Sequence, residues 1–172
     1  MSDVIISEEL PATIESFKNF VNRIAVTPEG GAVCIVTALS LFSRRVCEDC
    51  LSIIIHRDRL QEYPDSFEGW RLQNHDQQLI NGQILDKPWI PASYYVGTSP
   101  VNSYSIPPLP FRFSISRDTY SSSDPDRKKV FVTSSGADSP RPVTLKRDDR
   151  GIWKALEWSS LLLGVRPPEK AV

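Results

Sequence analysis

The sequence contains few histidines and cysteines and has no excess of charge of either sign. Its 172 residues include 2 histidines, 3 cysteines, 20 basic and 21 acidic residues. A nucleic-acid-binding domain normally carries a basic stripe that displaces phosphate counterions, and this balance argues against one. The longest nearly apolar run, Ala32–Phe42, is interrupted by Thr37 and Ser40 and is too short to cross a bilayer. We therefore expect partners other than nucleic acid and membrane.

The N-terminus lacks the basic and apolar regions of a signal peptide. The odd number of cysteines predicts free thiols in a reducing compartment, so we expect a cytoplasmic protein. Apolar residues make up 40% of the chain and charged residues 24%, which is ordinary for a globular protein. The length predicts a single domain over residues 1–168, followed by a disordered tail at 169–172.

The N-terminal half is predicted to be helical. Apolar residues recur at helical spacing from Ile14 to Ile24, after Pro11 in the first turn. Thr27 and Pro28 suit the N-cap and first position of a buried helix that runs to about Ser43. The segment Cys47–Ile55 fits either a helix or a buried strand, and we favour the helix. A fourth helix is predicted from Asn74, as its cap, to about Leu85.

The C-terminal half is predicted to form strands. Pro88–Pro110 contains several prolines and four aromatic residues, which indicates an ordered, extended loop. Period-two alternation and turn residues predict strands at Phe111–Ser116, Lys129–Thr133, Val143–Lys146 and Ile152–Ala155. Trp158–Val165 fits a closing strand or a helical turn. The predicted fold is α+β, with about four N-terminal helices packed on a C-terminal antiparallel sheet of four to five strands.

Two sequence features are candidates for redox or metal chemistry. Cys47 and Cys50 form a CxxC motif, but the acidic residues between them would raise a thiol pKa. Structural cysteines are therefore the favoured interpretation. A zinc site from this pair and His56 would need a fourth ligand from Cys34 or His75, and no second paired motif exists. The sequence predicts no metal and no cofactor.

His56 is also a candidate general base, although the sequence contains no nucleophile turn for it to activate. A boundary histidine at the end of a core element is the favoured interpretation. His75 is expected to face solvent.

The polar loops supply the remaining candidates. Thr133–Arg141 offers hydroxyls and a guanidinium that suit an anion, or else forms a hairpin connection, which we favour. The aromatic residues of Pro88–Pro110 either line a pocket or partner-binding face, or cover one edge of the sheet. The candidate binding residues are Trp89, Tyr94, Tyr95, Asn102, Tyr104, Ser135, Asp138 and Arg141. No catalytic residue is predicted.

Several motifs occur in a fixed order along the chain. They are TPEGGA at Thr27–Ala32, CLSIIIHRDRL at Cys50–Leu60, PWIPASYYVGTSPVNSY at Pro88–Tyr104, and KVFV, SSGADSPRPVTL, GIWK and a SSLL-GV-PP ending within Lys129–Pro168. In these motifs the chain resembles a family of small, uncharacterised bacterial domains. The resemblance implies one bacterial α+β domain and carries over no catalytic residue. The family has an aspartate where this chain has His56, which weakens any essential carboxylate role at that position.

The favoured function is non-enzymatic binding of another protein, as an accessory, effector-associated or immunity component of a bacterial toxin or secretion system. This rests on the lack of a catalytic motif and on the aromatic, proline-braced loop. The alternative is a ligand-binding or enzymatic domain with a cone-shaped, nuclear-transport-factor-like pocket lined by Tyr94, Tyr104, His56 and Arg141. A scaffold that forms homo-oligomers is a third interpretation.

Overall fold

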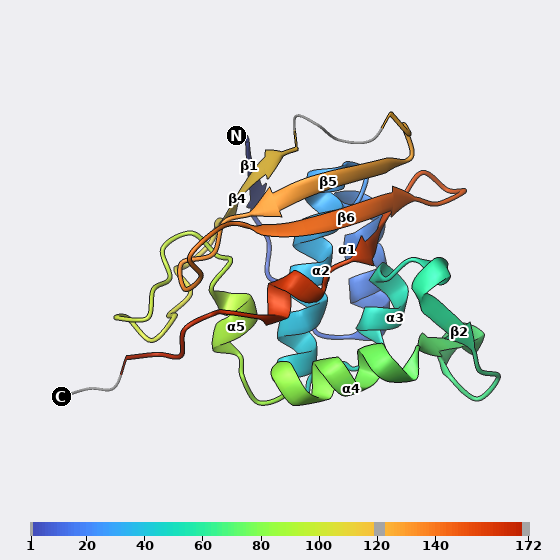
Figure 1. Ribbon diagram of the computed structural model, residues 1–172, viewed down its shortest axis with the longest axis horizontal. Coiled ribbons are helices and arrows are strands. Elements are labelled where there is room, and N and C mark those ends of the chain that lie inside the picture. Colours follow the sequence, from blue (N-terminus) through green and yellow to red (C-terminus); the bar gives the residue numbers. More distant parts are fainter. Residues whose placement is uncertain (1, 119–122, 170–172) are drawn as a thin grey trace.

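Helix α2 runs through the middle of the fold, between a curved antiparallel sheet and the other helices (Figure 1). A computed structural model describes residues 2–118 and 123–169. The elements in chain order are β1 (Ser2–Ile6), α1 (Ile14–Ile24), α2 (Pro28–Ser43), α3 (Cys50–Ile54), β2 (Leu60–Glu62), β3 (Trp70–Leu72), α4 (Asn74–Gln83), α5 (Trp89–Ala92), β4 (Phe111–Arg117), β5 (Arg127–Val132), β6 (Arg141–Arg147) and β7 (Trp153–Glu157). The predicted α+β fold is confirmed.

The five-stranded sheet has the order β1-β4-β5-β6-β7, with every neighbouring pair antiparallel. Strands β4 to β7 form the predicted C-terminal meander. Strand β1 was not predicted, and it adds an N-terminal edge strand to the sheet by pairing Ser2 with Ile115 and Ile6 with Phe111. Only Ile6 of this strand is buried, so the alternation that identifies strands is weak there.

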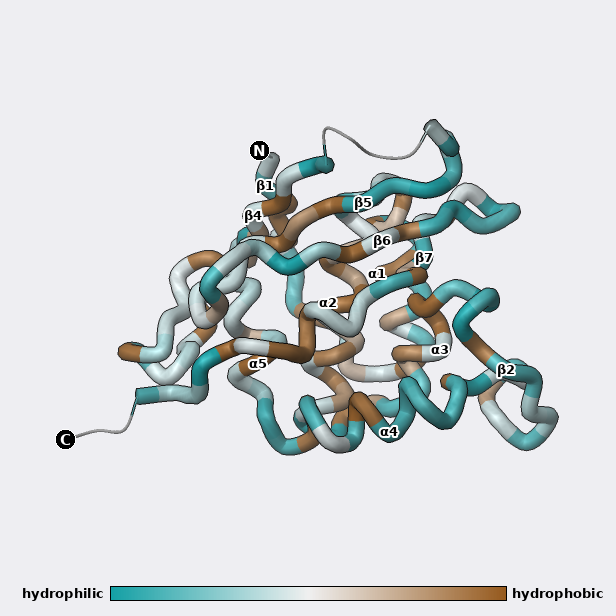
Figure 2. The backbone as a smooth tube through the Cα atoms, viewed as in Figure 1, coloured by the Kyte–Doolittle hydropathy of each residue, from teal (hydrophilic) through white to brown (hydrophobic). Residues whose placement is uncertain are grey.

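Every residue of α2 except Glu29 is buried, as its nearly uniform apolar composition predicted. The helix packs against β5, β6 and β7 on one side and against α1, α3 and α5 on others. Figure 2 shows hydrophobic positions concentrated along α2 and the strands that face it. The predicted cap is confirmed, because the Thr27 hydroxyl accepts a hydrogen bond from the Gly30 N–H at 3.0 Å.

Helix starts differ from the prediction by a few residues. Thr13 caps α1, and Pro11 lies before the helix instead of in its first turn. Gln73 is the N-cap of α4, and Asn74 is the first helical residue. Helix α3 confirms a helix within Cys47–Ile55, while Ile55 leaves the helix and forms a parallel bridge with Ala155 of β7.

Two segments for which the sequence allowed an extended conformation form helical turns. Helix α5 forms in a segment that was predicted to be extended. Pro91 is tolerated there because it lies in the first turn, where its missing N–H has no intrahelical acceptor. Within Trp158–Val165, residues Ser159–Leu162 form a 3-10 turn.

The predicted disordered tail, 169–172, is described only at its first residue. The Glu169 N–H donates to the Pro100 carbonyl at 3.0 Å, so residue 169 is bonded to the domain. Residues 170–172 lie outside the described residues.

Candidate functional site

The three candidate tyrosines are part of the core. Tyr94 and Tyr95 are 1% exposed and Tyr104 is 3% exposed. The Tyr94 hydroxyl donates to the Leu161 carbonyl at 2.7 Å, and burial raises the pKa of Tyr94. The Tyr104 hydroxyl donates to the Arg166 carbonyl at 2.5 Å. Tyr94 and Tyr104 thus bond the middle segment to the C-terminal segment, and all three rings are too buried to contact a partner at the surface.

Trp89 and Asn102 also have internal roles. Trp89 is half-buried against the core at the start of α5. The Asn102 side chain accepts from the Ser99 N–H at 2.9 Å and donates to the Gly97 carbonyl at 3.0 Å. Its polar atoms therefore close a turn, as asparagine commonly does in loops.

The loop Thr133–Arg141 bonds to other parts of the chain. The Ser135 N–H donates to the Ser93 carbonyl at 2.8 Å, and the Ser135 hydroxyl lies 3.0 Å from that of Thr98. Asp138 forms an ion pair with Arg166 at 2.9 Å. Arg141 donates to the Leu163 carbonyl at 2.9 Å. These contacts support a structural connection, in which the Ser134 hydroxyl also accepts from the Gly136 N–H of its own turn at 3.2 Å and Ser135 bonds to Ser93 after α5.

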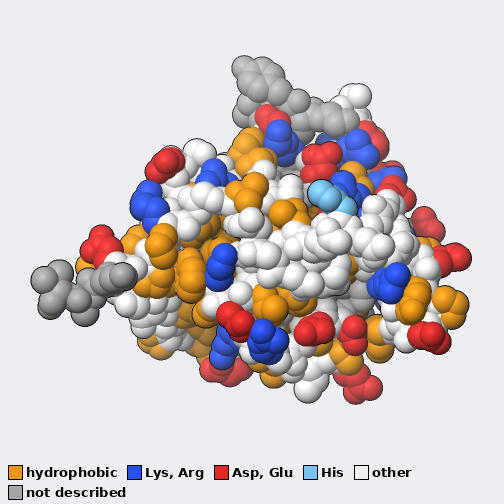
Figure 3. Space-filling model, turned by 60° about the horizontal axis from the view of Figure 1, so that its bottom comes forward, with side chains coloured by type: hydrophobic (Ala, Val, Ile, Leu, Met, Phe, Trp, Pro, Cys, Tyr) orange, Lys and Arg blue, Asp and Glu red, His pale blue; other side chains and the backbone are white. Residues whose placement is uncertain are grey.

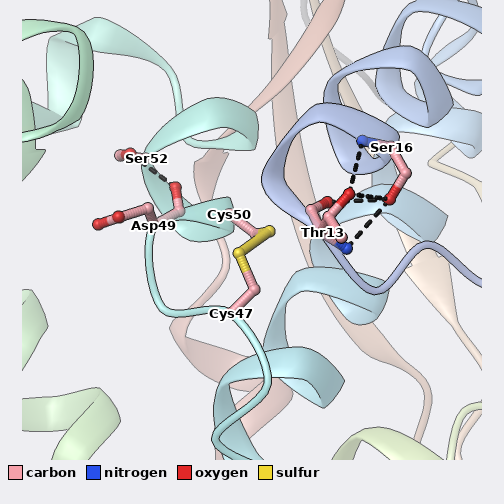
Figure 4. Close-up of a disulfide and its surroundings, with 6 residues drawn as sticks. All are labelled: Thr13, Ser16, Cys47, Asp49, Cys50 and Ser52. Atoms are coloured by element: carbon pink, nitrogen blue, oxygen red, sulfur yellow. Dashed lines mark hydrogen bonds between the residues drawn. A yellow bond between two sulfur atoms is a disulfide. The ribbon is translucent and has the colours of Figure 1, made fainter.

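The CxxC cysteines are joined as a disulfide between Cys47 and Cys50 (Figure 4). The expectation of free thiols is therefore wrong for this pair and holds for Cys34 alone. Burial raises the pKa of Cys34, so its thiol is unreactive. A cytoplasmic location stays a prediction.

We expect the disulfide to add only modest stability. Under non-reducing conditions, the denatured protein should show one reactive thiol, that of Cys34, and all three after reduction. The closed loop is short, so replacing both Cys47 and Cys50 with serine should lower the free energy of unfolding by about 2 kcal/mol. Thiol titration and urea denaturation measure both effects. Three reactive thiols without reductant would show that the bond is absent in solution.

His56 is separated from the other residues of the predicted cone-shaped pocket. Its backbone N–H donates to Ala155 at 2.8 Å, and its ring Nδ1 accepts from the Asp58 N–H at 3.1 Å. Burial lowers the pKa of His56, which keeps the ring neutral near pH 7. The cavity that it lines includes none of Tyr94, Tyr104 and Arg141. His75 is exposed, as expected.

An apolar groove of about 670 Å³ lies between three segments that are distant in the sequence. We define the apolar groove by the following residues: Glu9–Ala12, Thr37, Ser40, Leu41, Arg44, Val46, Ile106–Leu109 and Phe111. The inner wall is α2, where the Thr37 hydroxyl is already bonded to the Val33 carbonyl at 2.8 Å. The outer wall is the proline-rich end of the predicted extended loop.

The rim of the apolar groove exposes large hydrophobic side chains. Val46 is 44% exposed, and Ile106 and Leu109 are each 37% exposed. The ring of Phe111, which lines the apolar groove, packs edge-on against the ring of Tyr95, with 5.6 Å between the ring centres. The buried tyrosine thus positions this wall without forming part of it.

Arg44 is the cation at the rim of the apolar groove. Its side chain is exposed and forms no ion pair with any residue in 2–118 or 123–169. The neighbouring Arg45, by contrast, is held by Asp86 at 2.9 Å. An unpaired guanidinium beside apolar side chains is suited to a carboxylate that arrives with an apolar ligand.

The apolar groove was not predicted, because it combines segments that are separated by 25 or more positions. The run Ile106-Pro-Pro-Leu-Pro was the available signal, since it places large apolar residues where neither helix nor sheet can bury them. On the face shown in Figure 3, hydrophobic side chains gather near the C-terminal segment and charged ones are spread over the remainder.

The chain matches one protein-family model over most of its length. Residues 9–169 match the model of the family described as Domain of unknown function (DUF6935). The chain belongs to this family. No curated protein and no solved structure matches it. Within the described part of this DUF6935 domain, no three histidine, cysteine or acidic residues are grouped to hold a metal ion. Its described helices include none with the length and apolar character needed to cross a membrane.

Proposed function

We propose that this DUF6935 domain binds another protein, and that the apolar groove receives an apolar peptide segment of that partner. The exposed rim formed by Val46, Ile106 and Leu109 is the observation that carries the proposal. Covering such side chains contributes about 25 cal/mol per Å² of apolar surface removed from water. The volume of about 670 Å³ suits a few side chains of a docked segment.

The charged residues at the rim of the apolar groove indicate which charges the bound segment should carry. An acidic side chain of the partner would pair with Arg44, which has no ion pair within the described chain. Glu9 on another part of the rim disfavours a second acid there. The expected ligand is therefore an apolar segment with one carboxylate, not a polyanion.

The outer wall is prepared for binding before a partner arrives. Pro107, Pro108 and Pro110 fix their own backbone φ angles, so this wall loses little freedom when it is covered. Preorganisation of this kind raises affinity because less ordering entropy is lost on association.

Selection from a random peptide library tests this function, because it requires no assumption about which protein the partner is. We expect enriched peptides with apolar residues and one acid. The variants Ile106→Asp and Leu109→Asp should weaken their binding about tenfold or more, because a carboxylate would be buried in the apolar groove. Fluorescence anisotropy with a labelled peptide measures the change. Arg44→Glu should weaken binding similarly, and a peptide with lysine in place of its acid should restore it.

Val101→Asp is the matched control. Val101 belongs to the same proline-rich loop and is 75% exposed, but it does not line the apolar groove. This variant should bind the selected peptides as tightly as the unmodified chain. Equal loss in Val101→Asp and Leu109→Asp, or the absence of any enriched peptide, would contradict the proposal.

A bacterial toxin or secretion component is one partner class to include in the binding measurements, and a second copy of this chain is another. Size-exclusion chromatography over a range of concentrations separates these two. A dimer that Leu109→Asp dissociates would assign the apolar groove to self-association instead of to a different protein.

A further inference from the structure

A second cavity is rich in charged side chains and shares no lining residue with the apolar groove. Its volume is about 440 Å³, and it is bounded by α1, the end of α3, the β2–β3 hairpin and the β6–β7 hairpin. Six cationic side chains line it: Lys18, Arg57, Lys146, Arg147, Arg150 and Lys154. Three acidic residues line it, Glu68, Asp148 and Asp149. We call this cavity the basic pocket.

Four of these six cations are already paired with a carboxylate. Lys18 pairs with Glu68, Lys146 with Asp58, Arg147 with Asp126, and Lys154 with Asp148. The two cations without an ion pair among the described residues are Arg57 and Arg150.

Lys154 is held in the wall of the basic pocket by the protein itself. Its side chain is 21% exposed, and its ammonium donates to the Ile53 carbonyl at 2.5 Å. Oδ2 of Asp148 lies 4.0 Å from this ammonium, while Oδ1 accepts from the backbone N–H groups of Arg150 and Ile152 at 2.9 and 3.0 Å. This is the longest of the four ion pairs, and an ammonium carries three donors, so Lys154 has donors left for a ligand.

Arg57 and Arg150 form no ion pair with any residue that the structure describes. The Arg57 guanidinium lies 5.0 Å from the centre of the Trp70 ring, an arrangement that orients it without neutralising it. Burial lowers the pKa of Lys154, the Asp148 charge opposes this shift, and the Arg150 and Arg57 charges add to it. Arg57 and Arg150 thus lie near Lys154 without a carboxylate partner of their own among the described residues, and an anion that contacts all three cations would be attracted by them.

His56 adds a neutral donor to the same pocket. Its Nδ1 accepts a hydrogen bond from the Asp58 N–H, so the neutral ring carries its proton on Nε2. Phe67 and Trp70 also line the basic pocket and supply aromatic surface beside these polar groups.

We propose that the basic pocket binds a small phosphate ester, with Arg57, Arg150 and Lys154 around the phosphate. Two guanidinium groups and an ammonium offer more donors than the two oxygens of a carboxylate can accept, whereas a phosphate group matches them. The aromatic wall suits an organic group attached to the phosphate, and the volume is within the range of small-ligand sites. This site is independent of the apolar groove and of peptide binding there.

Titration with named probes tests the proposal. The probes are inorganic phosphate, sugar phosphates and nucleoside monophosphates, with citrate as a carboxylate of comparable charge and sodium chloride as the control for ionic strength. Tryptophan fluorescence provides the signal, because Trp70 lines the pocket and Trp153 lies beside Arg147. We expect saturable binding of at least one phosphate ester, tighter than that of inorganic phosphate or citrate.

Charge-removing variants locate the site. Arg57→Gln and Arg150→Gln should each weaken ester binding about tenfold or more, and both side chains are exposed, so the fold should be retained. Lys154→Met should weaken it as well, with the thermal midpoint recorded to separate unfolding from lost affinity. Arg44→Gln is the matched control, because it removes an exposed and unpaired arginine from the other cavity. Lack of saturable ester binding, preference for citrate, or equal weakening by Arg44→Gln would overturn the proposal.

Discussion

Replacing Gly30 with alanine is expected to remove most of the stability of the domain. A Cβ atom at this position would lie 1.7 Å from the carbonyl oxygen of Ile24 and 2.8 Å from its carbonyl carbon. Both are backbone atoms at the end of α1, so a side-chain rotation cannot relieve the clash. Because α2 lies at the centre of the fold, separating α1 from it disturbs the whole core. We expect a loss of about 4 kcal/mol or more in the free energy of unfolding, measured by urea denaturation.

Gly82→Ala is the control, since the same substitution should have the opposite effect there. Gly82 lies in α4, and apart from its chain neighbours and the backbone of the same helix no atom is within 4 Å of the Cβ that alanine would add. Alanine favours helix over glycine by up to about 1 kcal/mol, so this variant should be slightly more stable than the unmodified chain. Similar stability of the Gly30→Ala and Gly82→Ala variants would contradict the close approach of α1 and α2.

The parts of the fold that were predictable are those determined by local chemistry. The Thr27-Pro28 start of α2 satisfies N–H groups within one turn, and the alternation in Phe111–Ser116 separates the buried from the exposed face of one strand. Strand β1 and helix α5 were missed for the converse reason. Strand β1 depends on pairing with β4, more than 100 residues away, and α5 on contacts with α2 that outweigh a weak local preference.

The candidate site was harder to predict because a tyrosine suits two environments. Its ring favours burial and its hydroxyl needs a partner, so Tyr94 and Tyr104 are equally compatible with an interface and with a core. The deciding contacts are the carbonyl groups of Leu161 and Arg166, more than 60 positions later in the chain. The cations of the basic pocket illustrate the same limit, since α1, η1 (Arg57–Arg59) and the β6–β7 hairpin meet only in the folded protein.

The second large effect is expected at Tyr95, which was a candidate binding residue in the sequence analysis. Its ring lies 4.6 Å from that of Phe113 and 5.6 Å from that of Phe111, and it is 1% exposed. Truncation to alanine would leave a cavity beside β4 and remove both aromatic contacts. We expect Tyr95→Ala to lower the free energy of unfolding by about 3–5 kcal/mol. Urea denaturation, monitored by circular dichroism, measures this loss.

Removing only the hydroxyl groups separates packing from hydrogen bonding at the adjacent tyrosines. The Tyr95 hydroxyl is buried and finds no hydrogen-bond partner among the described residues, so Tyr95→Phe should be neutral or stabilising. The Tyr94 hydroxyl donates to Leu161, and Tyr94→Phe should therefore cost about 1–2 kcal/mol by leaving that carbonyl with one bond fewer. If Tyr95→Ala left stability unchanged, its ring would be free to serve a partner after all. If Tyr95→Phe were the more damaging of the two phenylalanine variants, the Tyr95 hydroxyl would have a partner in solution that the buried geometry does not provide.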